Sequence, residues 1–176
     1  LCGALYVLLY FDASGFLRLG LLAAFLHEWG HIGAYLALFG RFPVIEVTLT
    51  GFCMRTRGRE MTLWQTALLA AAGPAVNFVL AGLWMLRLEQ RATIRASAFL
   101  AANLLTGAFN LLPIPPLDGS KVLAAFLPDR QYITLMRYER YGIVVLLVLS
   151  FVGIGSSLIS RGILGIYSAL LSLIFG

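Results

Sequence analysis

Charged residues are scarce in this sequence of 176 residues. Asp, Glu, Lys and Arg together make up 12% of it, whereas hydrophobic residues make up 60%. The mean hydropathy is +0.90, and an average soluble domain has about twice this share of charged residues. The composition therefore indicates an integral membrane protein. The net charge of +5 comes from arginines between the apolar stretches, a placement typical of contact with lipid headgroups rather than nucleic acid.

Cysteine and histidine are also rare, with two of each. Cys2 and Cys53 are too few for a disulfide framework and lack the spacing of a zinc site, so neither is assigned a role. The sequence has no low-complexity region, no long polar insertion and no solenoid repeat. We therefore expect a single intramembrane domain over residues 1–176.

Long apolar stretches are plentiful. Those at 15–39, 61–86, 97–112, 141–160 and 162–175 can each cross about 30 Å of hydrocarbon. Residues 1–11 resemble the end of another such stretch and lack the basic start and cleavage site of a signal peptide. The sequence predicts an all-α polytopic membrane protein with about six transmembrane helices.

The longest polar interruption lies between residues 40 and 60. Residues 44–50 alternate large apolar with polar or smaller side chains, Gly51 is a turn signal, and residues 52–54 can form a returning strand. This pattern predicts a small β-hairpin or re-entrant strand. An open strand edge is costly in hydrocarbon, so we expect the strand to lie at the interface or its edge to be filled by another segment.

Both histidines fall in the stretch His27-Glu28-Trp29-Gly30-His31, inside the apolar run 15–39. On a helix, positions 27 and 31 lie about 40° apart around the axis and one turn apart along it, so both imidazoles can reach one metal ion. Zinc with two histidines, one further protein ligand and an open water position is a hydrolytic site, and Glu28 can act as the base. The alternative is a pair of hydrogen-bonded histidines in a helix bundle.

The third ligand has to be a carboxylate or a thiolate, because no other histidine exists. Most acidic residues lie at the edges of apolar stretches or in polar connections. Asp118 instead follows Asn110 in an apolar segment that three prolines prevent from being a continuous helix. Broken backbone at membrane depth is tolerated where it is buried in protein or lines a polar cavity. The alternative role for Asp118 is that of a helix N-cap.

These motifs resemble those of the site-2 protease family of intramembrane zinc metalloproteases, particularly its small bacterial members without PDZ or nucleotide-sensing domains. HEWGH is similar to the HExxH of the family, Gly73-Pro74-Ala75-Val76-Asn77 to its G-P-x-x-N segment, and residues 110–119 to its N-x-x-P-x-P-x-x-D-G pattern. The resemblance covers a catalytic core at about 15–127 and leaves residues 141–176 as C-terminal helices.

The resemblance implies one Zn²⁺ per chain. Its ligands would be His27, His31 and Asp118, and Glu28 would be the catalytic base and acid. Asn110 is implied near the reacting carbonyl, as a hydrogen-bond donor to the substrate backbone or to the developing oxyanion.

The resemblance also implies a partner for the predicted strand. A helical substrate has to be locally extended before its peptide bond can be attacked, and strand addition would replace its lost hydrogen bonds. Asn77 and Asn103 are further candidates for substrate contact, with interhelical hydrogen bonding as the alternative. The expected strand positions are Val44, Ile45, Glu46, Val47 and Thr48.

The sequence therefore predicts an intramembrane zinc metalloendopeptidase in the bacterial cell membrane. A membrane zinc hydrolase of a lipid or small amphiphile is one alternative, although a lipid has no backbone to pair with a strand. A zinc-binding or transport protein is another, although a carrier needs no base such as Glu28. The expected partners are a transmembrane protein substrate, the lipid bilayer and a regulatory membrane protein, and no nucleic acid.

Overall fold

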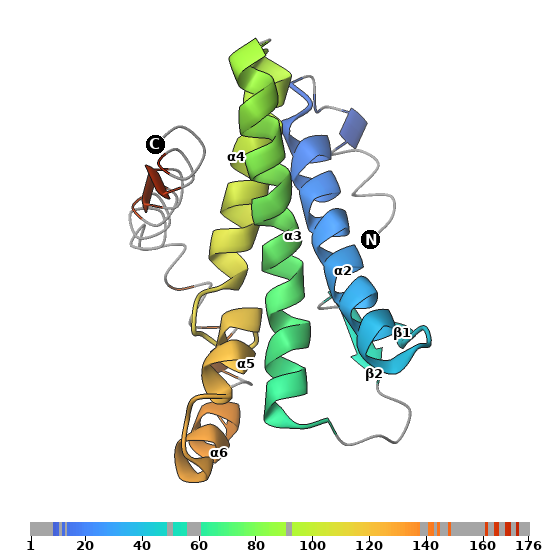
Figure 1. Ribbon diagram of the computed structural model, residues 1–176, viewed down its shortest axis with the longest axis vertical. Helices are drawn as coiled ribbons and strands as arrows, with labels where there is room; N and C mark the ends of the chain where they lie inside the picture. Colours follow the sequence, from blue (N-terminus) through green and yellow to red (C-terminus); the bar gives the residue numbers. More distant parts are fainter. Residues whose placement is uncertain are drawn as a thin grey trace.

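The computed structural model describes residues 9, 10, 12, 14–48, 51–55, 61–90 and 93–137, together with isolated positions between 141 and 172 (Figure 1). Its elements are the helix α2 (Phe16–Phe39), the strands β1 (Val44–Thr48) and β2 (Gly51–Arg55), and the helices α3 (Leu63–Gln90), α4 (Ile94–Asn110), α5 (Asp118–Ala124) and α6 (Asp129–Arg137). The architecture is mostly helical, as the sequence predicts.

The helix ends follow from local side chains. Gly40 ends α2 in the left-handed region at φ 66°, where its N–H donates to the carbonyl of Leu36. Thr62 and Gln65 form a reciprocal capping box before α3: the N–H of Gln65 donates to Thr62 Oγ1 at 3.2 Å, and the N–H of Thr62 donates to Gln65 Oε1 at 3.1 Å. Thr93 caps α4 by accepting from the N–H of Ala96.

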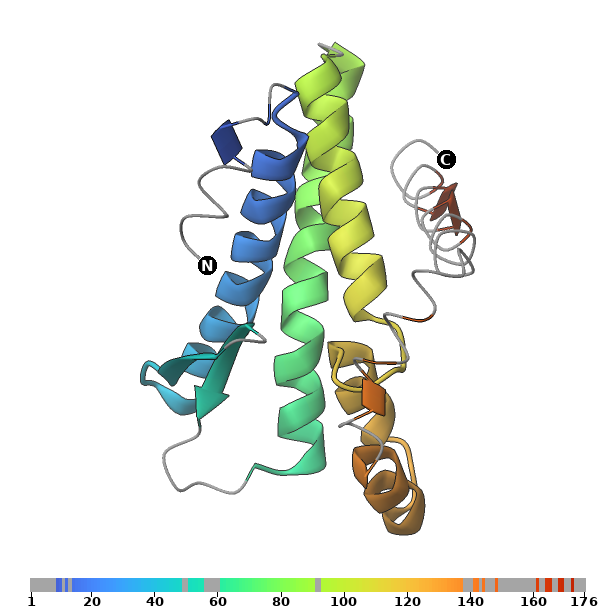
Figure 2. The ribbon, with the colours of Figure 1, turned by 180° about the vertical axis from the view of Figure 1, so that it is seen from behind.

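Three long helices form the body of the molecule. Figures 1 and 2 show α2, α3 and α4 side by side, and each packs on the other two. Several of the residues buried on these helices are small: Ala23 and Ala81 are fully buried, and Ala70 is nearly so. Small side chains let helix backbones approach closely, which is the usual packing of helices in membranes.

The strands β1 and β2 pair antiparallel, from Val44 opposite Arg55 to Thr48 opposite Gly51. They follow α2 directly and lie beside its C-terminal half (Figures 1 and 2). Among the described residues the sheet has these two strands alone, so each strand keeps one edge without a partner strand there. This pair occupies the segment for which the sequence predicts a hairpin or re-entrant strand.

One helix of the described part of the chain is long and apolar enough to cross a membrane, over Leu63–Arg87. The helices α2, α3 and α4 coincide with three of the predicted apolar stretches. The stretches 1–11, 141–160 and 162–175 lie outside the described residues apart from isolated positions, so the total of about six membrane helices stays a prediction.

Candidate metal centre

The HEWGH motif lies on α2 and turns both of its histidines inward. His27 is 4% exposed and His31 is 7% exposed, whereas Trp29 between them is 51% exposed. Glu28 is half-buried. One face of α2 therefore carries both imidazoles into the protein, as the i, i+4 spacing predicts.

Two glycines make room for these imidazoles. A Cβ on Gly30 of α2 would lie 2.7 Å from the carbonyl oxygen of Ala72 on α3. A Cβ on Gly73 of α3 would lie 2.5 Å from Nε2 of His31 and 2.7 Å from Cε1 of His27. Gly30 thus allows the close crossing of α2 and α3, and Gly73 leaves the space that both rings occupy. Both effects depend on glycine having no side chain.

Asp118 reaches the histidines from α5. The chain leaves α4 at Asn110, and α5 begins at Asp118 with Leu117 as its N-cap residue. The alternative prediction, that Asp118 is the N-cap residue of this helix, is therefore wrong. Gly119 lets this connection fold tightly, because a Cβ there would clash with the carbonyl of Leu111. The side chain of Asp118 is left available for the cluster.

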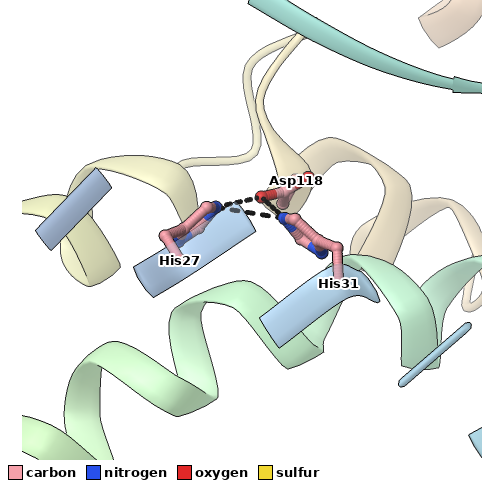
Figure 3. Close-up of side chains that lie close together, drawn as sticks. All are labelled: His27, His31 and Asp118. Carbon is pink, nitrogen blue, oxygen red and sulfur yellow. Dashed lines mark hydrogen bonds and ion pairs between the residues drawn. The ribbon is translucent and has the colours of Figure 1, made fainter. Parts of the chain in front are cut away.

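Three ligand-type atoms meet in one place (Figure 3). Oδ2 of Asp118 lies 3.0 Å from Nε2 of His27 and 3.1 Å from Nε2 of His31. The two Nε2 atoms are 3.1 Å apart, and the ring planes are nearly perpendicular at 85°. Lys121 approaches the other carboxylate oxygen, with Nζ 3.7 Å from Oδ1, so Oδ2 alone faces the histidines.

This arrangement fits a zinc ion. Ligand atoms bound to tetrahedral Zn²⁺ at about 2.0–2.1 Å lie about 3.3 Å from one another, close to the 3.0–3.1 Å of this triangle. The Nδ1 atoms of both imidazoles, which face away from Asp118, are hydrogen-bonded to oxygens. Nδ1 of His31 is 2.8 Å from the carbonyl of Leu69, and Nδ1 of His27 is 2.7 Å from Oδ1 of Asn77. A neutral imidazole that donates from Nδ1 presents the lone pair of Nε2 to a metal.

His27, His31 and Asp118 are also the group of metal-ligating side chains found among the described residues. The sequence-predicted ligands are thus brought together by α2 and α5, with α3 behind them. Two histidines and one carboxylate form a donor set typical of catalytic zinc, which keeps its fourth position for water.

The other predicted site residues lie elsewhere. Asn110 is half-buried at the end of α4, and its Nδ2 donates to the carbonyl of Thr106 in the same helix. The backbone of residues 44–48 forms β1, whereas the side chains of 45–48 lie outside the described part. The role of Asn110 and of β1 in binding a substrate stays a prediction.

Asn77 and Asn103 lie in the interior, on α3 and α4. Both have 0% exposure, and their amides bond to each other, with Asn77 Nδ2 3.0 Å from Asn103 Oδ1. The two side chains form a buried network beside His27, and their contact with a substrate stays a prediction. The alternative of interhelical hydrogen bonding describes the pair of amides better.

Sequence reasoning missed two parts of this site. The carbonyl of Leu69 contacts His31, and no side-chain pattern marks a backbone acceptor. Gly73 faces both imidazoles. Gly73 precedes Pro74, and a Gly-Pro pair inside a helix indicates a position where the backbone comes close to another group. Nothing in the local sequence indicates which side chains approach it.

Comparison with known proteins finds similarity both in sequence and in structure. No family model matches the chain. The chain is 34% identical over 103 residues to a protein of Bacillus subtilis (strain 168) named "Putative zinc metalloprotease YwhC". The aligned region covers 51% of this chain and 47% of the relative. The chain thus spans about half the length of this curated relative.

One solved structure that matches is the site-2 protease from Methanocaldococcus jannaschii. Its TM-score is 0.62 at 20% sequence identity, and the match covers 96% of this chain and 82% of the other. At this identity the likeness shows a shared fold. The sequence similarity to a protein named as a zinc metalloprotease and the shared fold both agree with the three motifs.

Proposed function

We propose that this protein is an intramembrane zinc metalloendopeptidase, which hydrolyses a peptide bond within or next to a transmembrane segment of a substrate protein. The observation that carries the proposal is the buried triangle of His27 Nε2, His31 Nε2 and Asp118 Oδ2, with edges of 3.0–3.1 Å. Glu28 lies on the same helix, next to the first of these ligands. A carboxylate beside a three-ligand zinc site is the arrangement that hydrolysis needs.

The residues have separate roles in this proposal. His27, His31 and Asp118 hold the ion, which when bound supplies a Lewis acid that lowers the pKa of a water molecule to about 7. Glu28 accepts a proton from the attacking water and returns it to the leaving amine. The amide of Asn110 donates to the substrate backbone or to the oxygen that gains negative charge.

The substrate in this proposal is an extended peptide that pairs with an edge of the β1–β2 sheet. Each strand has one edge without a partner strand among the described residues. An extended peptide added to such an edge recovers backbone hydrogen bonds through the strand, and a lipid cannot do so. This favours a peptide over a lipid or a small amphiphile as substrate.

The membrane setting is supported by the outer surface of the helices. Phe25, Leu68, Val79 and Leu83 are all between 54% and 61% exposed, and such a surface is unfavourable in water. We place α2, α3 and α4 in the bilayer as part of a multi-pass protein of the bacterial cell membrane. Its partners would be a transmembrane substrate and a regulatory membrane protein.

The first test compares the purified chain with its Glu28→Gln variant in detergent. We expect about one zinc per chain in both proteins, and cleavage of a model transmembrane peptide that falls by about 10²–10⁴-fold in the variant, because the proton acceptor is lost. Zinc is measured by elemental analysis and cleavage by mass spectrometry. The control is Asp12→Asn, a carboxylate before the start of α2 that accepts from the N–H of Arg18 and is not in the ligand cluster, which should keep both properties.

Two further assays separate the alternatives. In sealed lipid vesicles, a zinc carrier would keep zinc flux in the Glu28→Gln variant and would cleave no peptide. A lipid hydrolase would leave the peptide intact in the unsubstituted protein while releasing acyl chains from a lipid vesicle. Either result would contradict the proposed endopeptidase.

A further inference from the structure

Asn77 is a fully buried amide in the middle of α3 whose polar atoms all have partners. Its Oδ1 lies 2.7 Å from Nδ1 of His27. Its Nδ2 lies 3.1 Å from the carbonyl oxygen of Ala23 and 3.0 Å from Oδ1 of Asn103. The side chain has 0% exposure, so water cannot replace any of these contacts.

The network defines which way the amide of Asn77 faces. The carbonyl of Ala23 can only accept, so it has to face the NH₂ group of Asn77. The orientation of the Asn103 amide is fixed in the same way. Its Nδ2 donates to the carbonyl of Phe99 at 2.9 Å, so its Oδ1 is the atom that accepts from Asn77. A flipped amide at position 77 would turn its oxygen toward two acceptors. Oδ1 of Asn77 therefore faces His27 as an acceptor.

The orientation of Asn77 in turn defines the proton position on His27. An acceptor 2.7 Å from Nδ1 requires the ring to donate there, and a neutral imidazole has one N–H only. Nε2 is then the unprotonated nitrogen, and it points at Asp118 Oδ2 and at Nε2 of His31. The ring is held in the tautomer that a metal needs.

The two histidines obtain this support differently. Nδ1 of His31 faces the backbone carbonyl of Leu69 at 2.8 Å, which no substitution can remove. Nδ1 of His27 faces a side chain. One ligand is thus oriented by the helix backbone, and the other depends on a single replaceable amide.

We propose that Asn77 is a positioning residue for the metal centre: its carbonyl oxygen holds His27 in the Nδ1–H tautomer, and Asn103 holds that oxygen in place. The inference rests on the proposed function only in that the ligand cluster binds zinc. Asn77 contacts the ligand and not the reacting atoms, so it is not a catalytic residue. Outer hydrogen bonds of this kind commonly change metal affinity by about 10–100-fold.

The test measures zinc affinity by competition with a chelator, on the full chain in detergent. Asn77→Leu removes the acceptor and keeps the same branching of the non-hydrogen atoms, and we expect zinc to bind about 10–100-fold more weakly. Asn77→Asp keeps an oxygen for His27 Nδ1 but loses both donations, to Ala23 and to Asn103. We expect this variant to bind zinc within about threefold of the unsubstituted chain, because it retains the acceptor that defines the tautomer.

The pair of variants separates positioning from simple helix packing. If Asn77 only joined α3 to its neighbours, Asn77→Asp would lose zinc as severely as Asn77→Leu, since it lacks both interhelical donors. Equal loss in the two variants would therefore overturn the proposal, as would unchanged affinity in both. Should Asn77→Leu fail to fold, Asn77→Asp decides alone: near-normal affinity supports the proposal and a loss of tenfold or more overturns it.

A second readout is the visible absorption of the Co²⁺-substituted protein, which reports ligand geometry independently of cleavage. We expect the spectrum of Asn77→Asp to match that of the unsubstituted chain and that of Asn77→Leu to differ. Thr134→Val is the control, because the Thr134 hydroxyl donates to the carbonyl of Arg130 in its own helix, α6, and its loss should leave zinc affinity unchanged. If the unsubstituted chain binds no zinc, the proposed function itself fails. If it binds zinc and cleaves peptide while Asn77→Leu keeps normal affinity, only this inference fails.

Discussion

At the scale of single residues, the metal centre depends on an absent side chain as much as on the ligands present. Gly73 sits on α3 opposite both imidazoles, where a Cβ would lie 2.5–2.7 Å from atoms of His31 and His27. No real Cβ is found this close to a neighbour. A methyl group there has to push the rings away from Asp118.

We predict that Gly73→Ala weakens zinc binding at least tenfold while the protein still folds, because displaced imidazoles no longer converge on one ion. Chelator competition measures the affinity, and circular dichroism checks the helical content. The matched control is Gly82→Ala on the same helix, where a Cβ meets nothing within 4 Å. Normal zinc affinity in Gly73→Ala would show that the rings are not packed against α3 as described.

At the scale of elements, the crossing of α2 and α3 determines where the ligands lie. Gly30 stands at this crossing, one residue before His31, and a Cβ on it would lie 2.7 Å from the carbonyl of Ala72 and 3.0 Å from Cγ2 of Val76. A backbone oxygen cannot turn aside as a flexible side chain can. The helices would have to separate to accept a methyl group.

We predict that Gly30→Ala lowers the free energy of unfolding by about 1–3 kcal/mol, the usual cost of overpacking a tight interface. Gly33→Ala, one turn along α2, meets nothing within 4 Å and should be neutral or slightly stabilising, because alanine favours the helix. Thermal unfolding of both variants in the same detergent gives the comparison. Equal stability of the two variants would argue against close contact at Gly30.

At the scale of the whole molecule, the three long helices are apolar on both sides. Their inner faces bury small residues such as Ala23 and Ala81, and their outer faces expose large ones such as Leu68 and Val79. The charged residues of the site are few, and Asp118 is only 9% exposed. This distribution of side chains suits a lipid environment, because the apolar outer faces then contact acyl chains instead of water.

We predict that the protein stays in the membrane fraction through alkaline carbonate extraction and is released only by detergent, because its exposed apolar side chains contact acyl chains. Immunoblotting of pellet and supernatant measures the distribution. Val79→Arg places a charge on this outer face, where the cost is about 2.5–3.5 kcal/mol at the bilayer centre, and should reduce the amount inserted. Quantitative release of the unsubstituted protein at alkaline pH would contradict the membrane placement.

Much of this was predictable from the sequence because it depends on short-range pattern. The i, i+4 spacing of His27 and His31 requires a helix for both to share a site, and α2 is that helix. The alternation from Val44 onward predicts a strand, and β1 runs Val44–Thr48. Three prolines before Asp118 predict a broken segment, and the chain has no helix between Asn110 and Asp118.

The tertiary structure decided what depends on distant pairing. Asn77 is 50 residues from His27 along the chain, and Asp118 is 91 residues from it. Spacing alone cannot say which amide meets which ring, and only the structure places the amide of Asn77 beside His27. Local pattern acts over a helical turn or a strand pair, whereas the meeting of α2, α3 and α5 is determined by which glycines and alanines let their backbones approach.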